Sequence, residues 1–164
     1  MLTIIYPKED YTSADIAIRV QALAQGQGQK IYVVPKHYGR NEENVFAKLS
    51  KATSILFIAH DKLNIDQNTE KELSFLSSKG KKVHYIVPTD MNLTTDSTYI
   101  HKYLNNNKMD FANAIQGFIQ KIQTNEQGSK KINKENAVLL AVSMLIVTII
   151  FLLIISNLNN NEKD

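Results

Sequence analysis

The side chains best suited to binding or catalysis stand at the ends of short apolar runs. These candidate ligand-binding residues are Tyr6, Pro7, Asp10, His37, Arg40 and His60. If the runs are parallel strands, their carboxyl ends meet at one sheet edge, which is where open α/β sheets bind ligands. His37 and Arg40 would there contact a phosphate or a neighbouring domain. A solvated loop around these two residues, and a core position for the Tyr6 ring, are the alternatives.

Several kinds of chemistry are excluded by what the sequence lacks. There is no cysteine, which rules out disulfides, thiol catalysis and thiolate metal sites. The four histidines show no paired ligand spacing, so no metal site is predicted. Neither G-x-G-x-x-G nor a Walker A sequence is present. The net charge is only +3 and the lysines are scattered, so no direct DNA binding is expected.

The order of apolar runs predicts an α/β fold. Strands are expected at 2–6, 30–34, 54–59 and 82–87, and helices at 12–25, 42–51, 69–77, 99–104 and 111–122. Such alternation favours a flavodoxin-like parallel sheet of about four to five strands, flanked by helices and joined by right-handed crossovers. A fifth strand would lie near residues 93–100, within a segment, 89–97, that otherwise resembles a loop.

Residues 137–155 form one apolar run with no charge, proline or glycine. As a helix the run would be about 28 Å long, close to the ~30 Å hydrocarbon core of a bilayer. A buried core helix is the alternative, although such helices usually keep a polar stripe. The run therefore predicts a single transmembrane helix.

The flanks of this run give an orientation and a domain plan. Lys121, Lys130, Lys131 and Lys134 precede the run, and Lys163 follows it. The positive-inside rule then places the N-terminal part in the cytoplasm and the protein in the inner (cytoplasmic) membrane. We expect a cytoplasmic domain at 1–125, a polar linker at 126–136, the transmembrane helix at 137–156 and a polar tail at 157–164. On this plan the apolar helix adds nothing to the core of the domain.

Four segments together resemble the Toll/interleukin-1 receptor (TIR) domain in its bacterial form. They are IIYPKED at 4–10, KIYVVPKHYGR at 30–40, AKLSKATSILFIAHDKL at 47–63 and DQNTEKELSFLSSKGKKVHYIVP at 66–88. Tyr6 and Asp10 stand where the family has its tyrosine and aspartate. Residues 30–40 are placed like the second strand and the loop that follows it.

The resemblance also implies a role for Glu72. In enzymatic family members, a glutamate on the corresponding helix stabilises the ribose during cleavage of the nicotinamide bond of NAD. A carboxylate can do this because the transition state is oxocarbenium-like. Three positions depart from the family pattern: Asn68 replaces a tryptophan, and Pro7 and His60 replace serines. A solvated surface position for Glu72 is the alternative.

Three functions follow from these features. The first is a membrane-anchored, TIR-like anti-phage immune effector that responds to a nucleotide-type signal by oligomerising and perturbing the lipid bilayer. Ala137 and Ala141 form a small-xxx-small pair for helix association, and Ser143 or Thr148 offers a hydroxyl. The second is a membrane-anchored NAD hydrolase that uses Glu72. The third is a non-enzymatic adaptor that recruits a partner protein. The expected small molecule is accordingly NAD or a nucleotide second messenger.

Overall fold

The computed structural model contains five parallel strands and five helices among the residues it describes. These are residues 1–164 without 27, 29, 38–39, 62–63, 90, 92, 94–99, 104–106, 127–133 and 162–164. The strands are β1 (Leu2–Ile5), β2 (Ile31–Val33), β3 (Ser54–Ile58), β4 (Val83–Pro88) and β5 (Ile100–Tyr103). The helices are α1 (Tyr11–Gly26), α2 (Glu42–Ser50), α3 (Gln67–Ser78), α4 (Lys108–Glu126) and α5 (Lys134–Asn161).

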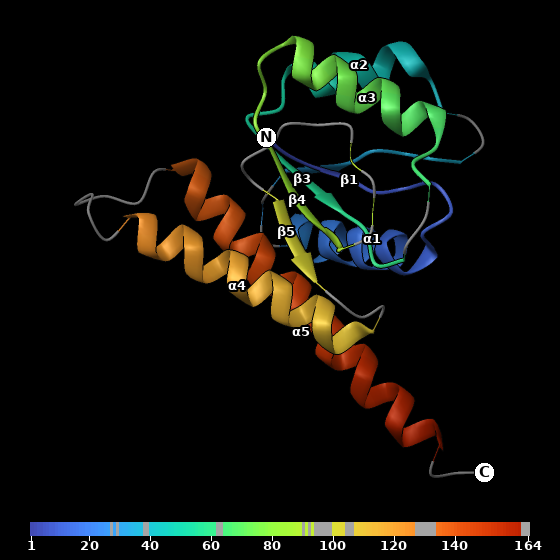
Figure 1. The fold of residues 1–164 in the computed structure, drawn as a ribbon, viewed down its shortest axis with the longest axis vertical. Coiled ribbons are helices and arrows are strands. Elements are labelled where there is room, and N and C mark those ends of the chain that lie inside the picture. Colours follow the sequence, from blue (N-terminus) through green and yellow to red (C-terminus); the bar gives the residue numbers. More distant parts are fainter. Residues whose placement is uncertain are drawn as a thin grey trace.

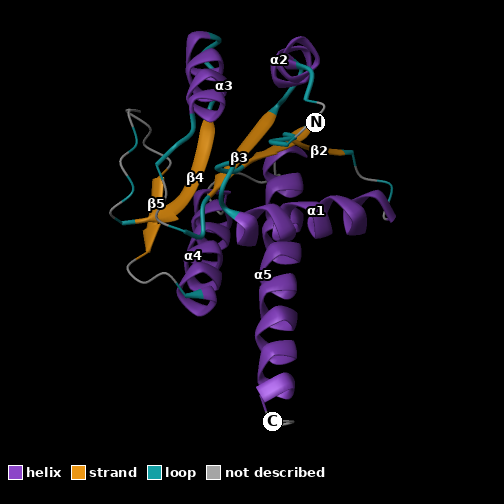
Figure 2. Ribbon diagram, turned by 90° about the vertical axis from the view of Figure 1, so that its right-hand side faces the viewer, coloured by secondary structure: helices purple, strands orange, loops and turns teal. Residues whose placement is uncertain are grey.

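The strand order is β2-β1-β3-β4-β5 and every pair is parallel, which confirms the flavodoxin-like parallel sheet of four to five strands predicted from the sequence. The central strands β1 and β3 are buried along their whole length. Apart from Thr3 and Ser54, their residues are apolar on both faces because helices cover both sides of a parallel sheet. Figures 1 and 2 show α2 and α3 on one side of the sheet and α1, α4 and α5 on the other.

Alternate residues of each strand point to opposite faces of the sheet, because the side chains of an extended chain alternate in direction. In β3, Ile55 and Phe57 belong to the core beneath α2 and α3. Leu56 and Ile58 belong to the core on the opposite side. The sheet thus separates two apolar cores.

Helix α3 begins two residues earlier than the sequence predicts, because Asp66 caps it. The Asp66 carboxylate accepts hydrogen bonds from the backbone N–H groups of Asn68 and Thr69, both at 3.1 Å. The helix ends at Ser78, and Gly80 follows in the left-handed region with φ of 61°. Glycine takes this conformation at no steric cost, so the turn into β4 is sharp.

The fifth strand corrects one prediction. Residues 99–104 were predicted as helix, whereas Ile100–Tyr103 form β5 and pair with β4 from Tyr85↔Ile100 to Pro88↔Tyr103. The run is too short to show a helical period, and its isoleucine and tyrosine have high β propensity. Most of the loop predicted at 89–97 lies outside the described residues.

Helix α5 contains Asn136–Ile155, a span with a mean hydropathy of 3.3, long and apolar enough to cross a membrane. In the structure this helix also packs against α1 and α4. Leu139, Val142 and Ile146 are at most 2 % exposed and share one apolar core with sheet residues. The expectation that the apolar helix adds nothing to the core is therefore wrong. Most of the predicted linker, 127–133, lies outside the described residues.

Candidate functional site at the carboxyl edge of the sheet

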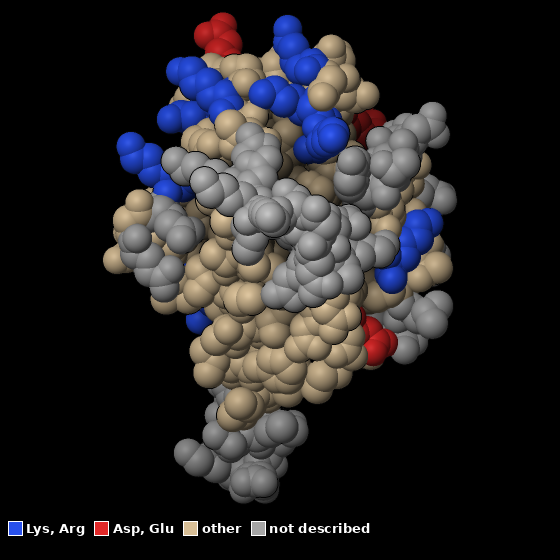
Figure 3. Space-filling model, turned by 90° about the vertical axis from the view of Figure 1, so that its left-hand side faces the viewer, with Lys and Arg blue, Asp and Glu red and all other residues tan. Residues whose placement is uncertain are grey.

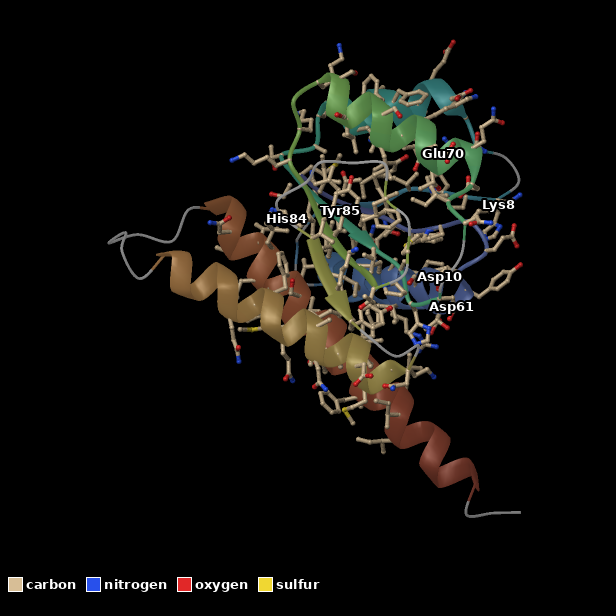
Figure 4. All side chains as sticks on the ribbon, in the orientation of Figure 1. Lys8, Asp10, Asp61, Glu70, His84 and Tyr85 are labelled. Atoms are coloured by element: carbon tan, nitrogen blue, oxygen red, sulfur yellow. The ribbon has the colours of Figure 1, made fainter. Side chains whose placement is uncertain are left out.

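The carboxyl ends of β1, β2 and β3 meet the first turns of α1 and α3 at one edge of the sheet. Figure 4 shows Lys8, Asp10, Asp61 and Glu70 at this edge, whereas His84 and Tyr85 lie on β4 within the sheet. Two groups of polar side chains occupy the edge, and all are buried except Asp61, whose side chain is 41 % exposed, and Arg40, whose side chain is 9 % exposed. We call them the Glu72 cluster (Lys36, Arg40, Thr69 and Glu72) and the Asp10 cluster (Asp10, Ser13, His60 and Asp61).

Glu72 is the centre of the first cluster and is completely buried. Its Oε2 atom lies 2.5 Å from Lys36 Nζ, and its Oε1 atom lies 2.6 Å from Arg40 Nη1. Thr69 and Leu76 are also fully buried, and their spacing from Glu72 puts all three on the inner face of α3. The alternative of a solvated surface glutamate is therefore wrong. Glu70, two residues earlier, is the exposed one.

Lys36 belongs to the segment between β2 and α2 and is 4 % exposed. Besides its ion pair with Glu72, its Nζ donates a hydrogen bond of 2.7 Å to Thr69 Oγ1. The Thr69 hydroxyl in turn donates to Asp66 Oδ2 at 2.6 Å. This chain of contacts ties the loop after β2 to the first turn of α3.

Burial controls the electrostatics of the cluster. It raises the pKa of Glu72 and lowers the pKa of Lys36, and the charge of each partner opposes the shift of the other. The contacts of both cations with the carboxylate favour the ionised form of Glu72 and so limit the rise of its pKa. Burial, and then the charge of Glu72, raises the pKa of Tyr6 and Tyr32 above the usual value, so both phenols are neutral at pH 7.

The guanidinium of Arg40 has donor groups that its contact with Glu72 does not use. Its side chain is 9 % exposed and reaches Glu72 through Nη1. The Nη2 amino group is also buried and makes no hydrogen bond to any residue that the structure describes. A guanidinium with one arm engaged can still bind an anion such as a phosphate through its other arm.

Asp10 holds the second cluster together. Its carboxylate is fully buried and accepts hydrogen bonds from Ser13 N at 2.9 Å, Ser13 Oγ at 2.8 Å and His60 N at 2.6 Å. Asp61 N approaches Oδ2 at 3.2 Å. These bonds join the start of α1 to the end of β3. Asp10 lies at the predicted edge, and both of its carboxylate oxygens already accept hydrogen bonds from other residues of the protein.

The remaining predicted residues differ in exposure. Tyr6 is 3 % exposed, Pro7 is also buried, and His37 is exposed. His60 is 7 % exposed, and its Nδ1 lies 2.8 Å from Asp61 Oδ1. The edge therefore combines buried Tyr6 and Glu72 and the partly exposed Arg40 with a more exposed rim.

Comparison with known proteins gives no match, whether with protein families, curated proteins or solved structures. The site must be interpreted from its own geometry. Among the described residues, no group of three or more histidine, aspartate or glutamate side chains is placed to hold a metal ion.

Sequence reasoning missed several members of the edge, and three of them show why. Lys36 stands between Pro35 and His37 in the same loop as Arg40, so its position after β2 was the available signal. Asp66 precedes a helix by the spacing of a cap. Tyr103 had no local signal: its hydroxyl donates to the carbonyl oxygens of Ala59 at 2.5 Å and His60 at 3.0 Å, more than forty residues away.

Proposed function

We propose that this protein is a membrane-anchored, TIR-like effector of anti-phage immunity that responds to a nucleotide-type signal. On this proposal the ligand binds at the carboxyl edge, and the chains oligomerise and perturb the bilayer. The observation that carries the proposal is the joining of an apolar helix long enough to span a membrane to a parallel α/β domain with an edge site. The unengaged Nη2 group of Arg40 supports an anionic ligand.

The burial of Glu72 and its contacts with two cations favour an effector over an enzyme. Cleavage of a glycosidic bond needs a carboxylate that faces the developing cation on the sugar. Both oxygens of Glu72 instead lie against Lys36 and Arg40, and none of its surface is exposed. The cations would have to move away before this carboxylate reached a ribose.

A membrane-anchored NAD hydrolase is the second candidate. Its support is the place of Glu72, buried on α3 at the same edge as Tyr6 and Arg40. The inner membrane and a cytoplasmic domain are likewise part of the proposal, and the lysines before α5 support this orientation. An adaptor role has no separate support from the geometry.

The test compares cellular NAD with membrane potential after induction of the full chain. We expect depolarisation while NAD stays constant. Thr148→Arg should abolish the depolarisation, because a charge at the centre of a span costs about 2.5–3.5 kcal/mol. Thr148 is exposed in the structure, so this change leaves the packing of α5 on the domain intact. Thr148→Leu is the matched control and should depolarise like the wild type.

The opposite pattern would overturn this ranking. If NAD fell before the membrane depolarised, and still fell in Thr148→Arg, the protein would be an NAD hydrolase whose activity does not need the span. Purified full-length protein incubated with NAD would then release nicotinamide. Constant NAD together with constant membrane potential would leave neither candidate standing.

A further inference from the structure

One face of α5 is built into the domain. Leu139, Val142, Ser143, Ile146, Ile149 and Ile150 recur at helical spacing and are at most 3 % exposed. All but Ser143 belong to the apolar core on the α1 and α4 side of the sheet. The other face is open: Met144 is 46 % exposed and Leu152 is 60 % exposed.

The neighbours of α5 are unsuited to lipid. Helix α4 runs beside α5 in the opposite direction (Figures 1 and 2). Its outer face carries exposed Asn113, Gln116 and Gln120. Helix α1 carries the exposed ion pair of Arg19 with Asp15. Polar and charged groups of this kind stay out of the hydrocarbon core. The part of α5 that lies against these helices therefore lies outside a bilayer.

Docking against the domain and spanning a bilayer require the same part of α5, so the helix is too short to do both at once. The packed stripe from Leu139 to Ile150 takes up about 17 Å of α5, at about 1.5 Å per residue. Only residues 151–155 of the apolar span lie beyond it, and they cover about 8 Å. A span needs about 30 Å of apolar helix. Figure 2 shows the end of α5 projecting past the rest of the domain.

We propose that α5 has two mutually exclusive positions: docked against α1 and α4, as in the structure, or released and inserted across a lipid bilayer. The proposal rests on the membrane function above and adds to it that insertion requires the helix to leave the domain. The docked position shields the packed stripe from water. The released position places the same stripe in lipid.

Ser143 is a weak point in the docked position. Its side chain is fully buried, and its Oγ makes no hydrogen bond to any described residue. Thr148, on the open face, donates a hydrogen bond of 3.0 Å to the carbonyl oxygen of Met144. An unsatisfied buried hydroxyl lowers the stability of the docked packing relative to exposure of the same group to water. On the face shown in Figure 3, a broad tan area without charged side chains lies above the grey end of the molecule, consistent with a surface near lipid.

The distance between α4 and α5 tests the proposal. The chain has no cysteine, so spin labels can be placed at Gln116→Cys and Met144→Cys, two exposed positions on the helices. We expect a short, narrow distance distribution for the full chain in buffer. With vesicles of phosphatidylethanolamine and phosphatidylglycerol, the distance should lengthen, because Met144 then lies about 12 Å inside the bilayer, eight residues from the start of the span at Asn136.

A matched pair of variants tests the coupling between docking and insertion. Ser143→Leu overfills the docked contact, whereas Thr148→Leu adds a similar apolar gain on the open face. We expect Ser143→Leu to raise the ratio of vesicle-inserted to free protein by about tenfold more than Thr148→Leu does. Equal effects of the two changes would mean that docking does not oppose insertion, and would overturn the proposal.

The outcomes also separate this proposal from the membrane function. If the protein inserted into vesicles while the label distance stayed short, the two positions would not be exclusive. The proposal would then fail and the membrane function would stand. If the wild type and both leucine variants all remained free in solution, the membrane function would fail and the proposal with it.

Discussion

Replacement of Glu72 by glutamine removes the negative charge from the Glu72 cluster and changes little else. Glutamine has nearly the same volume and a similar helix propensity. In the structure the carboxylate is the common partner of Lys36 and Arg40, whose side chains are 0 % and 9 % exposed. The substitution therefore leaves two buried cations without their counter-charge.

The size of the effect follows from this burial. Breaking a buried ion pair by removing one partner costs about 3–5 kcal/mol. In a chain of this length, 1 kcal/mol shifts the unfolding midpoint by about 2–4 °C. We therefore expect Glu72→Gln to lower the midpoint by about 6–20 °C. Adding Lys36→Met should recover part of this loss, because it removes one of the two unpaired charges.

Thermal unfolding of the full chain, followed by circular dichroism, measures the effect. Glu70→Gln is the matched control, since Glu70 lies on the same helix and is exposed. It should change stability by no more than about 0.5 kcal/mol. Equal midpoints for the two variants would show that Glu72 is not held between buried cations. The expected loss of stability also means that loss of activity in Glu72→Gln alone would not identify a catalytic carboxylate.

Three further changes test other parts of the structure by urea or thermal unfolding. Asp10→Ala should destabilise the protein by about 3 kcal/mol, because buried donors of Ser13 and His60 lose a charged acceptor; a loss no larger than that of Ser13→Ala would contradict this. Burial, and then the charge of Lys82, lowers the pKa of His84, so the stability of the protein should fall as pH drops below about 6.5. His84→Phe should flatten this dependence of stability on pH between about pH 7 and 5, and an unchanged slope would exclude His84 as its cause. Truncation after residue 126 should give a fragment that aggregates or binds a hydrophobic dye, because it uncovers the core that α5 shares with α1 and α4; a compact, stable fragment would refute this.

The fold was largely predictable because its signals are local. Continuous apolar runs, most of them ended by proline, mark the buried strands, and the helices between them fix a parallel sheet. The short edge strand β5 was missed, since four residues at a sheet edge carry too little periodicity. Its assignment depends on pairing with β4, which is a tertiary contact.

The candidate site was predictable only as a set of positions. The carboxyl edge brings Tyr6, Asp10, Arg40 and His60 into one region, as the strand ends predict. The contacts that define their chemistry join residues far apart in the chain: Lys36 and Glu72 are separated by 36 positions. No spacing rule within one element reveals such a pair. For the same reason the sequence left open whether Glu72 was solvated or buried.

Neither of the two proposed positions of α5 alone explains its sequence. A helix that served only to cover α1 and α4 would need apolar residues at Leu139, Val142 and Ile146, and would carry polar residues on its open face. The open face instead has Met144 and Leu152. A helix that served only as an anchor would not need one stripe that fits the core of the domain. The docked position alone does not explain the apolar residues on the open face, and the inserted position alone does not explain the stripe that fits the core. Exchange between the two proposed positions explains the apolar residues on both faces.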